Sequence, residues 1–121
     1  MLQMSPSAQI FVVHESVSFN IGFDGLIGFC RNILRVEPMT GAYFVFRSRT
    51  RKQLRVLVYD GEGWWLATKR FSKGSIKHWP NGDVPLSKVA ARELMVLLNR
   101  GNHKDAGYPE FWSRVDGGSC V

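Results

Sequence analysis

The chain has 121 residues, 45% of them hydrophobic, and carries 16 Lys and Arg residues against 10 Asp and Glu residues. This length suits one globular domain and excludes a multidomain machine. Two cysteines, Cys30 and Cys120, are too few for a disulfide framework, so we expect a reducing, cytoplasmic setting. The longest apolar stretch, Ile21 to Leu34, is interrupted by polar residues, so no membrane-spanning helix is predicted.

The first predicted elements are a strand and a helix. Gln9 to Glu15 is a short apolar run with β-branched side chains, which predicts a strand. From Phe23 to Leu34 apolar side chains recur every three or four residues, which predicts a helix with one buried stripe. Ser18 or Asn20 is expected to cap its start. Close backbone packing against a sheet would explain the glycines that weaken this helix, Gly22, Gly25 and Gly28.

Three further strands are predicted after a turn at Pro38 to Gly41. They are rich in aromatic and β-branched residues and separated by short polar connections, which predicts an antiparallel meander over Ala42 to Ser48, Leu54 to Asp60 and Trp64 to Phe71. Neighbouring residues on a strand point to opposite faces, so at least one of Trp64 and Trp65 should lie in the core.

The last predicted element is a helix that begins at Ser87 and ends before Gly101, after a loop over Lys73 to Gly82. Residues 102–121 show no sustained periodicity, and we expect this tail to be partly disordered, with an aromatic patch at Tyr108, Phe111 and Trp112. The predicted fold class is therefore α+β. One domain, residues 1–101, has an antiparallel sheet packed against two helices.

Positive charge is concentrated in one quarter of the chain. Between Arg47 and Lys77 lie nine basic and two acidic residues, a net charge of +7 against +6 for the whole chain. Such clustering is typical of a surface that binds a polyanion, because Lys and Arg displace counterions from phosphates. The alternative is that these residues lie on solvated hairpin faces without a ligand. The candidate nucleic-acid contacts are Arg47, Arg49, Arg51, Lys52, Arg55, Lys69, Arg70, Lys73, Lys77 and, for stacking on a base, Trp79.

The sequence contains no strong catalytic or metal-binding motif. It has no P-loop, no cysteine pair at zinc spacing and no HExxH, and its three histidines lie in separate segments. The enzyme hypothesis to weigh is a metal-dependent nuclease that uses Asp24, Asp60 and Glu62. The same carboxylates have structural explanations at a helix start and a hairpin turn. We therefore expect no catalytic residue, no metal and no cofactor.

Several motifs, in their order and spacing, resemble a known family. They are Phe23 to Leu26, Pro38 to Arg49 with its Phe-Val-Phe-Arg-Ser-Arg ending, Tyr59 to Gly63, Thr68 to Phe71, Lys73-Gly74 and Trp79-Pro80. Over Gln9 to Arg100 the chain resembles TnpB, the accessory protein from the second open reading frame of insertion-sequence-66 transposons. The chain departs from this family at Phe19 to Gly22, where a basic stretch is usual.

The resemblance implies a role in transposition of a bacterial mobile element, beside a separate catalytic transposase. It places the family's arginine-rich hairpin and Lys-Arg pair on Arg47, Arg49, Arg51, Lys69 and Arg70. The leading hypothesis is a non-catalytic accessory factor that binds DNA. The alternative is an adaptor that binds the transposase or another accessory protein without touching DNA. No membrane partner is expected, and the oligomeric state is left open.

Overall fold

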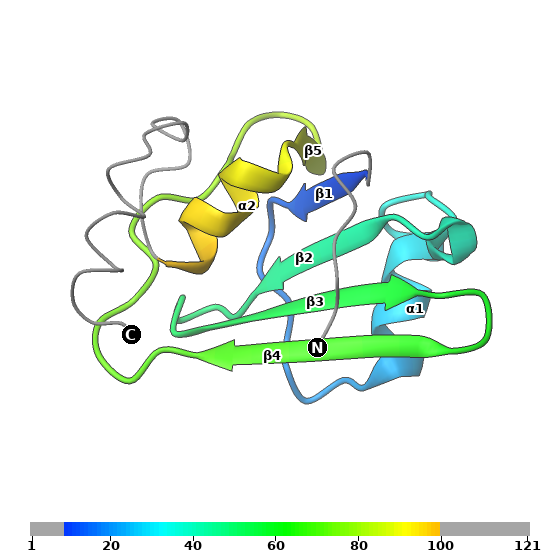
Figure 1. The fold of residues 1–121 in the computed structure, drawn as a ribbon, viewed down its shortest axis with the longest axis horizontal. Coiled ribbons are helices and arrows are strands. Elements are labelled where there is room, and N and C mark those ends of the chain that lie inside the picture. The colour runs from blue at the N-terminus through cyan, green and yellow to red at the C-terminus, as the bar shows by residue number, and fades with distance from the viewer. Residues whose placement is uncertain (1–8, 100–121) are drawn as a thin grey trace.

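A single sheet lies at the centre of residues 9–99, the part of the chain that the computed structural model describes. Its five strands are β1 (Ile10–Val13), β2 (Tyr43–Arg47), β3 (Gln53–Tyr59), β4 (Trp64–Arg70) and β5 (Leu86–Val89). They lie in the order β4-β3-β2-β1-β5 (Figure 1). The predicted meander of β2, β3 and β4 is confirmed, and β5 runs antiparallel to β1. The β1 and β2 pair is parallel, so the sheet is mostly rather than wholly antiparallel.

The helix between β1 and β2 explains their parallel pairing. Helix α1 (Phe23–Asn32) and the short 3-10 helix η1 (Pro38–Thr40) connect the two strands. Parallel neighbours need such a crossover, because the chain must return to the same end of the sheet before the second strand begins. Gly41, with φ of 90°, then turns the chain into β2 in a conformation that costs glycine little.

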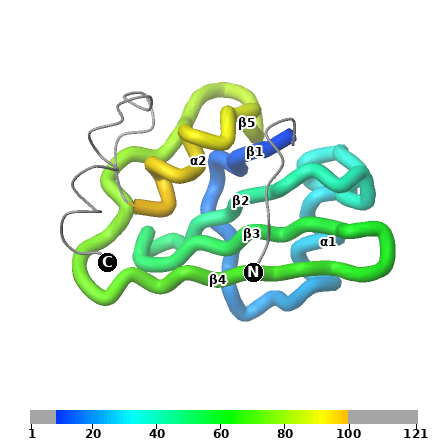
Figure 2. The backbone as a smooth tube through the Cα atoms, in the orientation of Figure 1, coloured from blue at the N-terminus to red at the C-terminus, as the bar shows by residue number. Residues whose placement is uncertain are grey.

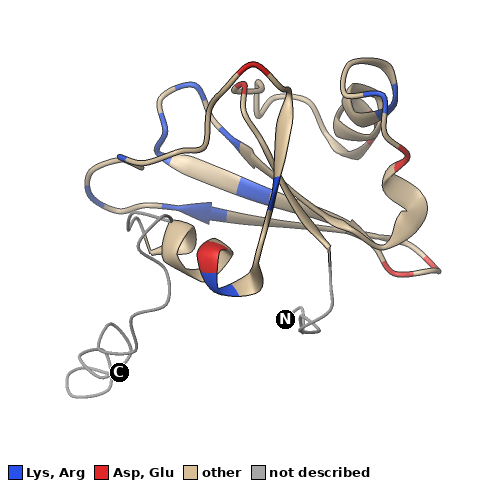
Figure 3. Cartoon of the chain, turned by 90° about the horizontal axis from the view of Figure 1, so that it is seen from above, with Lys and Arg blue, Asp and Glu red and all other residues tan. Residues whose placement is uncertain are grey.

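Side chains of the central strands alternate between two hydrophobic cores. One face of β1, β2 and β3 packs against helix α2 (Ala91–Leu98) through Leu94 and Leu97. The other face packs against α1 through Leu26, Ile27 and Cys30. Burial raises the pKa of the Cys30 thiol to about 12, as expected for a packing residue. The two helices therefore cover opposite faces of the sheet (Figure 1, Figure 3).

The segment around Ser87 is a strand, so the prediction of a helix starting there was wrong. Ser87 lies in β5, and its hydroxyl is hydrogen-bonded to Nε2 of His14. Helix α2 begins only at Ala91, where the Glu93 carboxylate accepts a hydrogen bond from the Ala90 N–H. Strand pairing wins because β1 would otherwise leave one row of backbone N–H and C=O groups without partners.

Helix α1 starts without the predicted side-chain cap. Its N-cap is Gly22, whose carbonyl accepts a hydrogen bond from the Leu26 N–H and which makes no side-chain cap bond. The Ser18 hydroxyl instead accepts a hydrogen bond from the Asn20 N–H, one turn before the helix. The chain therefore bends before α1, and the helix begins after a glycine that has no side chain to accept a hydrogen bond from its first N–H groups.

Some predictions concern residues outside 9–99. They are the tail over residues 102–121, its aromatic patch, the cysteine at 120 and the domain boundary after residue 101. Within residues 9–99, neither helix has the length and hydrophobicity needed to cross a bilayer.

Two glycines inside α1 give opposite predictions for alanine substitution. A Cβ on Gly28 would meet only Asn32 Nδ2 at 3.8 Å, so Gly28→Ala should raise the free energy of unfolding by up to about 1 kcal/mol. A Cβ on Gly25 would lie 2.5 Å from Ile21 Cβ, so Gly25→Ala must displace the chain entering the helix and should be destabilising. Close packing thus holds at Gly25, against Ile21 rather than the sheet. Urea unfolding checks both, and equal stabilisation would contradict the Ile21 contact.

Candidate nucleic-acid interface

The tip of the β2–β3 hairpin, residues 48–52, presents cations at one end of the sheet. The Ser48 N–H donates to the Gln53 carbonyl and the Arg51 N–H donates to the Ser48 carbonyl, both at 3.0 Å. These bonds close a tight turn, in which Arg51 has φ of 62°, a left-handed conformation that is uncommon for residues other than glycine. Arg49 and Lys52 project from the turn and are exposed.

Two backbone hydrogen bonds hold this tip to the chain that follows β4. The Phe71 N–H donates to the Lys52 carbonyl at 2.9 Å, and the Ile76 N–H donates to the Arg51 carbonyl at 2.7 Å. Ile76 is only 1% exposed, so the core anchors the loop that carries the exposed Lys77. Figure 2 shows the tip and this loop side by side.

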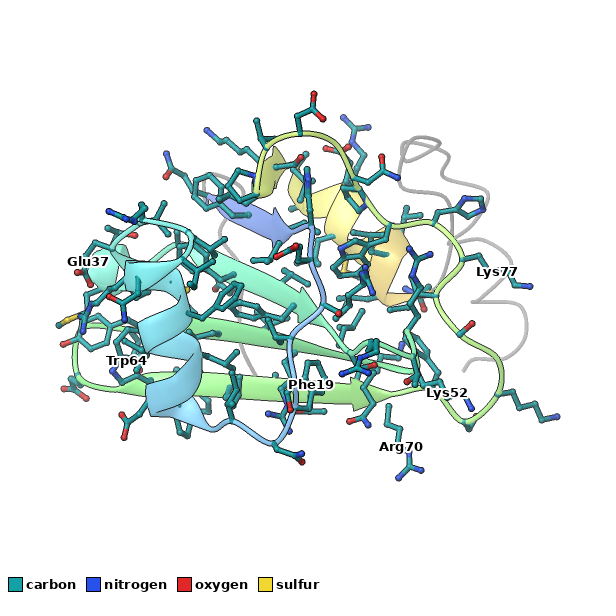
Figure 4. The ribbon with its side chains drawn as sticks, turned by 180° about the vertical axis from the view of Figure 1, so that it is seen from behind. Phe19, Glu37, Lys52, Trp64, Arg70 and Lys77 are labelled. Carbon is teal, nitrogen blue, oxygen red and sulfur yellow. The ribbon has the colours of Figure 1, made fainter. Side chains whose placement is uncertain are left out.

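The end of β4 also lies at the tip, because Arg70 pairs with Gln53 in the β3–β4 register. We call this region the basic end; its exposed cations are Arg49, Lys52, Arg70, Lys73 and Lys77. Asp60 and Glu62 lie in the β3–β4 turn, at the opposite end of the sheet. In Figure 3 blue gathers at the end of the sheet that holds the hairpin tip and red marks the β3–β4 turn at the other end, with further blue and red on the helices and loops. Figure 4 shows Lys52, Arg70 and Lys77 at one end and Glu37 at the other.

Arg47 lies apart from the exposed cations of the tip, because β2 ends at Arg47 and the turn begins after it. Its half-buried guanidinium donates to the carbonyl oxygens of His14 and Ser48, each at 3.4 Å. Burial lowers the pKa of Arg47, and the nearby positive charge of Arg51 lowers it further. This arginine therefore has a structural position beneath the tip.

Arg55 and Lys69 are also engaged within the protein. The Arg55 guanidinium lies 4.4 Å from the centre of the Phe19 ring and donates to the Ile21 carbonyl at 3.3 Å. On the other face of the sheet, Lys69 Nζ donates to the Leu98 carbonyl at 2.6 Å. These two side chains tie α1's entry segment and α2's last turn to the sheet.

Trp79 is a core residue, contrary to the expectation that its ring stacks on a base. It is 6% exposed, and its indole N–H donates to the Val13 carbonyl at 2.8 Å. Of the adjacent pair in β4, Trp64 packs against the α1 core and Trp65 is 49% exposed, which confirms the predicted split across the sheet. A loop tryptophan followed by proline gives no periodic signal of burial, so the sequence alone did not reveal its place.

The Asp60 carboxylate accepts hydrogen bonds from groups in and next to the β3–β4 turn. One oxygen accepts hydrogen bonds from the N–H groups of Glu62 and Gly63, both at 2.9 Å, and the other accepts one from the Trp65 indole at 2.7 Å. Within residues 9–99, no three His, Cys, Asp or Glu side chains form a group that could hold a metal ion.

The chain belongs to the family described as IS66 Orf2 like protein, because the family model TnpB_IS66 matches residues 8–105. This confirms the resemblance carried by the motifs. Two similar curated proteins come from Sinorhizobium fredii (strain NBRC 101917 / NGR234). "Uncharacterized protein y4hO" is 28% identical over 82% of this chain and 85% of its own length, and "Uncharacterized protein y4jC" is 34% identical over 81% and 83%. No solved structure matches the chain.

Trp79→Phe should destabilise the protein without changing its surface. The substitution leaves the buried Val13 carbonyl without its indole donor, which costs about 1–3 kcal/mol of the free energy of unfolding. Trp65→Phe is the matched control and should cost less, because that ring is half exposed. Urea unfolding measures both. A Trp79→Phe protein of unchanged stability would contradict the core position.

Asp60→Asn should give a stability loss that depends on pH. Hydrogen bonds from Glu62, Gly63 and Trp65 hold the pKa of Asp60 below its usual value, so folding favours the ionised form. That contribution is present above the pKa of the unfolded state, about 4, and is lost as pH falls through the lower folded-state pKa. Unfolding midpoints of the variant and the parent should therefore differ near neutral pH and converge in acid. A difference that persists unchanged in acid would contradict this assignment; Glu62→Gln is the control.

Proposed function

We propose that this protein is a non-catalytic accessory factor in the transposition of an IS66-type element, and that it binds nucleic acid through the basic end. The observation that carries the proposal is the separation of charge along the sheet. Five exposed cations gather where the β2–β3 tip, the end of β4 and the following loop meet, and two carboxylates lie at the far end.

Two carboxylates with established partners lie away from the basic end. Glu37 forms an ion pair with Arg31 at 2.9 Å, and Figure 4 places Glu37 far from Lys52, Arg70 and Lys77. Asp60 lies in the β3–β4 turn, at the opposite end of the sheet. Long, exposed Lys and Arg side chains suit phosphate contacts, which position a protein on nucleic acid without reading bases. Trp79 lies in the core, so its ring cannot stack on a base. The arrangement therefore favours binding that depends little on the nucleic-acid sequence.

Family membership supports the transposition role. The strand-transfer chemistry then belongs to a separate, element-encoded transposase, and this chain contributes a binding surface. A transposase and a further accessory protein are its expected partners, with DNA as the shared ligand.

Binding to a DNA duplex should fall steeply with salt. If the five exposed cations of the basic end each meet a phosphate, the slope of log K against log salt should be near −4.5, a loss of roughly 500-fold between about 50 and 200 mM. Arg49→Gln with Lys52→Gln should reduce the slope to about −2.7. Fluorescence anisotropy on the full chain measures both values.

The matched control is Arg35→Gln with Arg92→Gln, which removes the same charge from two exposed arginines elsewhere. This pair should leave the slope near that of the parent. Equal losses from both pairs would mean that only net charge matters and would refute a localised interface. Binding that is absent at low salt would refute nucleic-acid binding altogether.

A second candidate function, an adaptor for the transposase without DNA contact, is favoured by one observation. An apolar groove of about 510 Å³ lies between α2 and the β3–β4 hairpin, lined by residues such as Ala67 and Met95. Its proposed occupant is an apolar segment of the transposase. Ala67→Tyr fills this groove without changing charge. The adaptor would be supported over the DNA-binding factor by two results together. The Ala67→Tyr variant would no longer co-purify with the transposase, and DNA binding by the parent protein would not depend on salt.

A further inference from the structure

A polar hollow of about 500 Å³ lies beside the hairpin tip, on the side away from β4. Its lining includes Arg51 from the tip, Lys77, His78 and Asn81 from the loop after β4, and Lys88 from β5. These residues come from three separate segments of the chain, and the strand position of β5 completes the wall. The sequence pattern missed this hollow because it predicted a helix at Lys88.

The hollow has an excess of positive charge. Three Lys and Arg side chains line it, and Glu93 is its sole carboxylate among the lining residues. One oxygen of Glu93 already accepts a hydrogen bond from the Ala90 N–H at 2.7 Å, at the start of α2. No lining cation forms an ion pair with a carboxylate of residues 9–99. His78 and Asn81 add further hydrogen-bonding groups, a combination suited to an oxyanion.

Arg51 holds its place in the hollow at a conformational cost. Its φ of 62° lies in the left-handed region, which glycine enters without penalty and arginine does not. The Ser48 and Ile76 backbone bonds fix the peptide groups on both sides of it. Strained backbone that the surroundings hold in place is common at ligand-binding positions. Glycine would adopt this backbone conformation at lower cost than arginine. The presence of arginine at this position is therefore explained by its side chain, which lines the hollow.

We propose that this hollow binds one phosphate group of the nucleic-acid backbone, held by Arg51 and Lys77 with His78 and Asn81 around it. The inference rests on the proposed function and makes it more specific. Lys77 is one of the exposed cations of the basic end and Arg51 lies in the same hairpin tip, so the bound strand continues from the tip along the loop toward β5. The pre-formed backbone around Arg51 reduces the ordering cost of that contact.

The test is Arg51→Gly in the full chain, with Arg35→Gly as its matched control. Arg35 is exposed, has φ of 59° and lies two residues from Glu37, at the other end of the molecule, so the control makes the same chemical change in the same backbone conformation. Both variants should unfold at a higher urea concentration than the parent. With Arg51 as a sixth phosphate contact the parent's salt slope steepens from about −4.5 to about −5.4. Only Arg51→Gly should return the slope to about −4.5 and lose DNA affinity, by about eightfold at about 0.1 M salt.

The outcomes separate this inference from the proposed function. If Arg51→Gly and Arg35→Gly bind DNA alike while Arg49→Gln with Lys52→Gln binds weakly, the phosphate site is wrong and the interface stands. If none of these variants weakens binding, the proposed function fails as well.

A second measurement uses the unmodified protein and does not depend on any variant folding. Bound DNA should protect the Lys77 amine from acetylation in proportion to the fraction bound, with Lys69, whose Nζ is held by the Leu98 carbonyl, as internal reference. Equal protection by inorganic phosphate, at the same concentration of phosphate groups, would overturn the assignment to a nucleic-acid backbone.

Discussion

The structure depends on the central strands having two buried faces. Val12 and Val45 point into the α2 core, and Val13 and Phe44 point into the α1 core, so each face needs its own cover. Each of the two short helices can shield only part of a face. Helix α1 crosses β2, β3 and β4 near the end of the sheet that holds the β3–β4 turn, and the hairpin tip and the far end of β4 extend beyond it (Figure 1). The cations lie in the part of the sheet that the helix does not cover, because a charged side chain stays solvated there. Burying the same charge between the sheet and a helix would cost free energy.

Much of this arrangement could be predicted from the residues. Alternation and turn chemistry predicted the three meander strands to within one residue at every end, and the spacing of Leu26, Ile27 and Cys30 predicted the buried stripe of α1. The parallel β1–β2 pair and strand β5 could not be derived in this way. Pairing with β1 is a long-range contact, and Leu86 to Val89 is too short to show its own period.

The candidate site was predicted in outline and revised in detail. A count of charges located the basic segment but could not separate the exposed Arg49 and Lys52 from Arg47 and Arg55, which donate to carbonyl groups of the protein. Trp79 was misplaced because an aromatic ring beside lysine and histidine looks the same in sequence whether it stacks on a ligand or on the core. Backbone hydrogen bonds from the loop, which no pattern of side chains encodes, bring the tip and Lys77 together.

The two outer strands of the sheet could pair with strands of another molecule, and their residues oppose this pairing. Within residues 9–99, β4 and β5 each have one neighbour, so each presents unpaired backbone groups that another sheet could extend. β5 is only four residues long, follows Pro85 and contains Lys88, and β4 ends in Lys69 and Arg70. Short length, proline and positive charge all oppose strand addition and aggregation. Lysine and arginine at the margins of this sheet therefore also protect the fold against pairing with copies of itself.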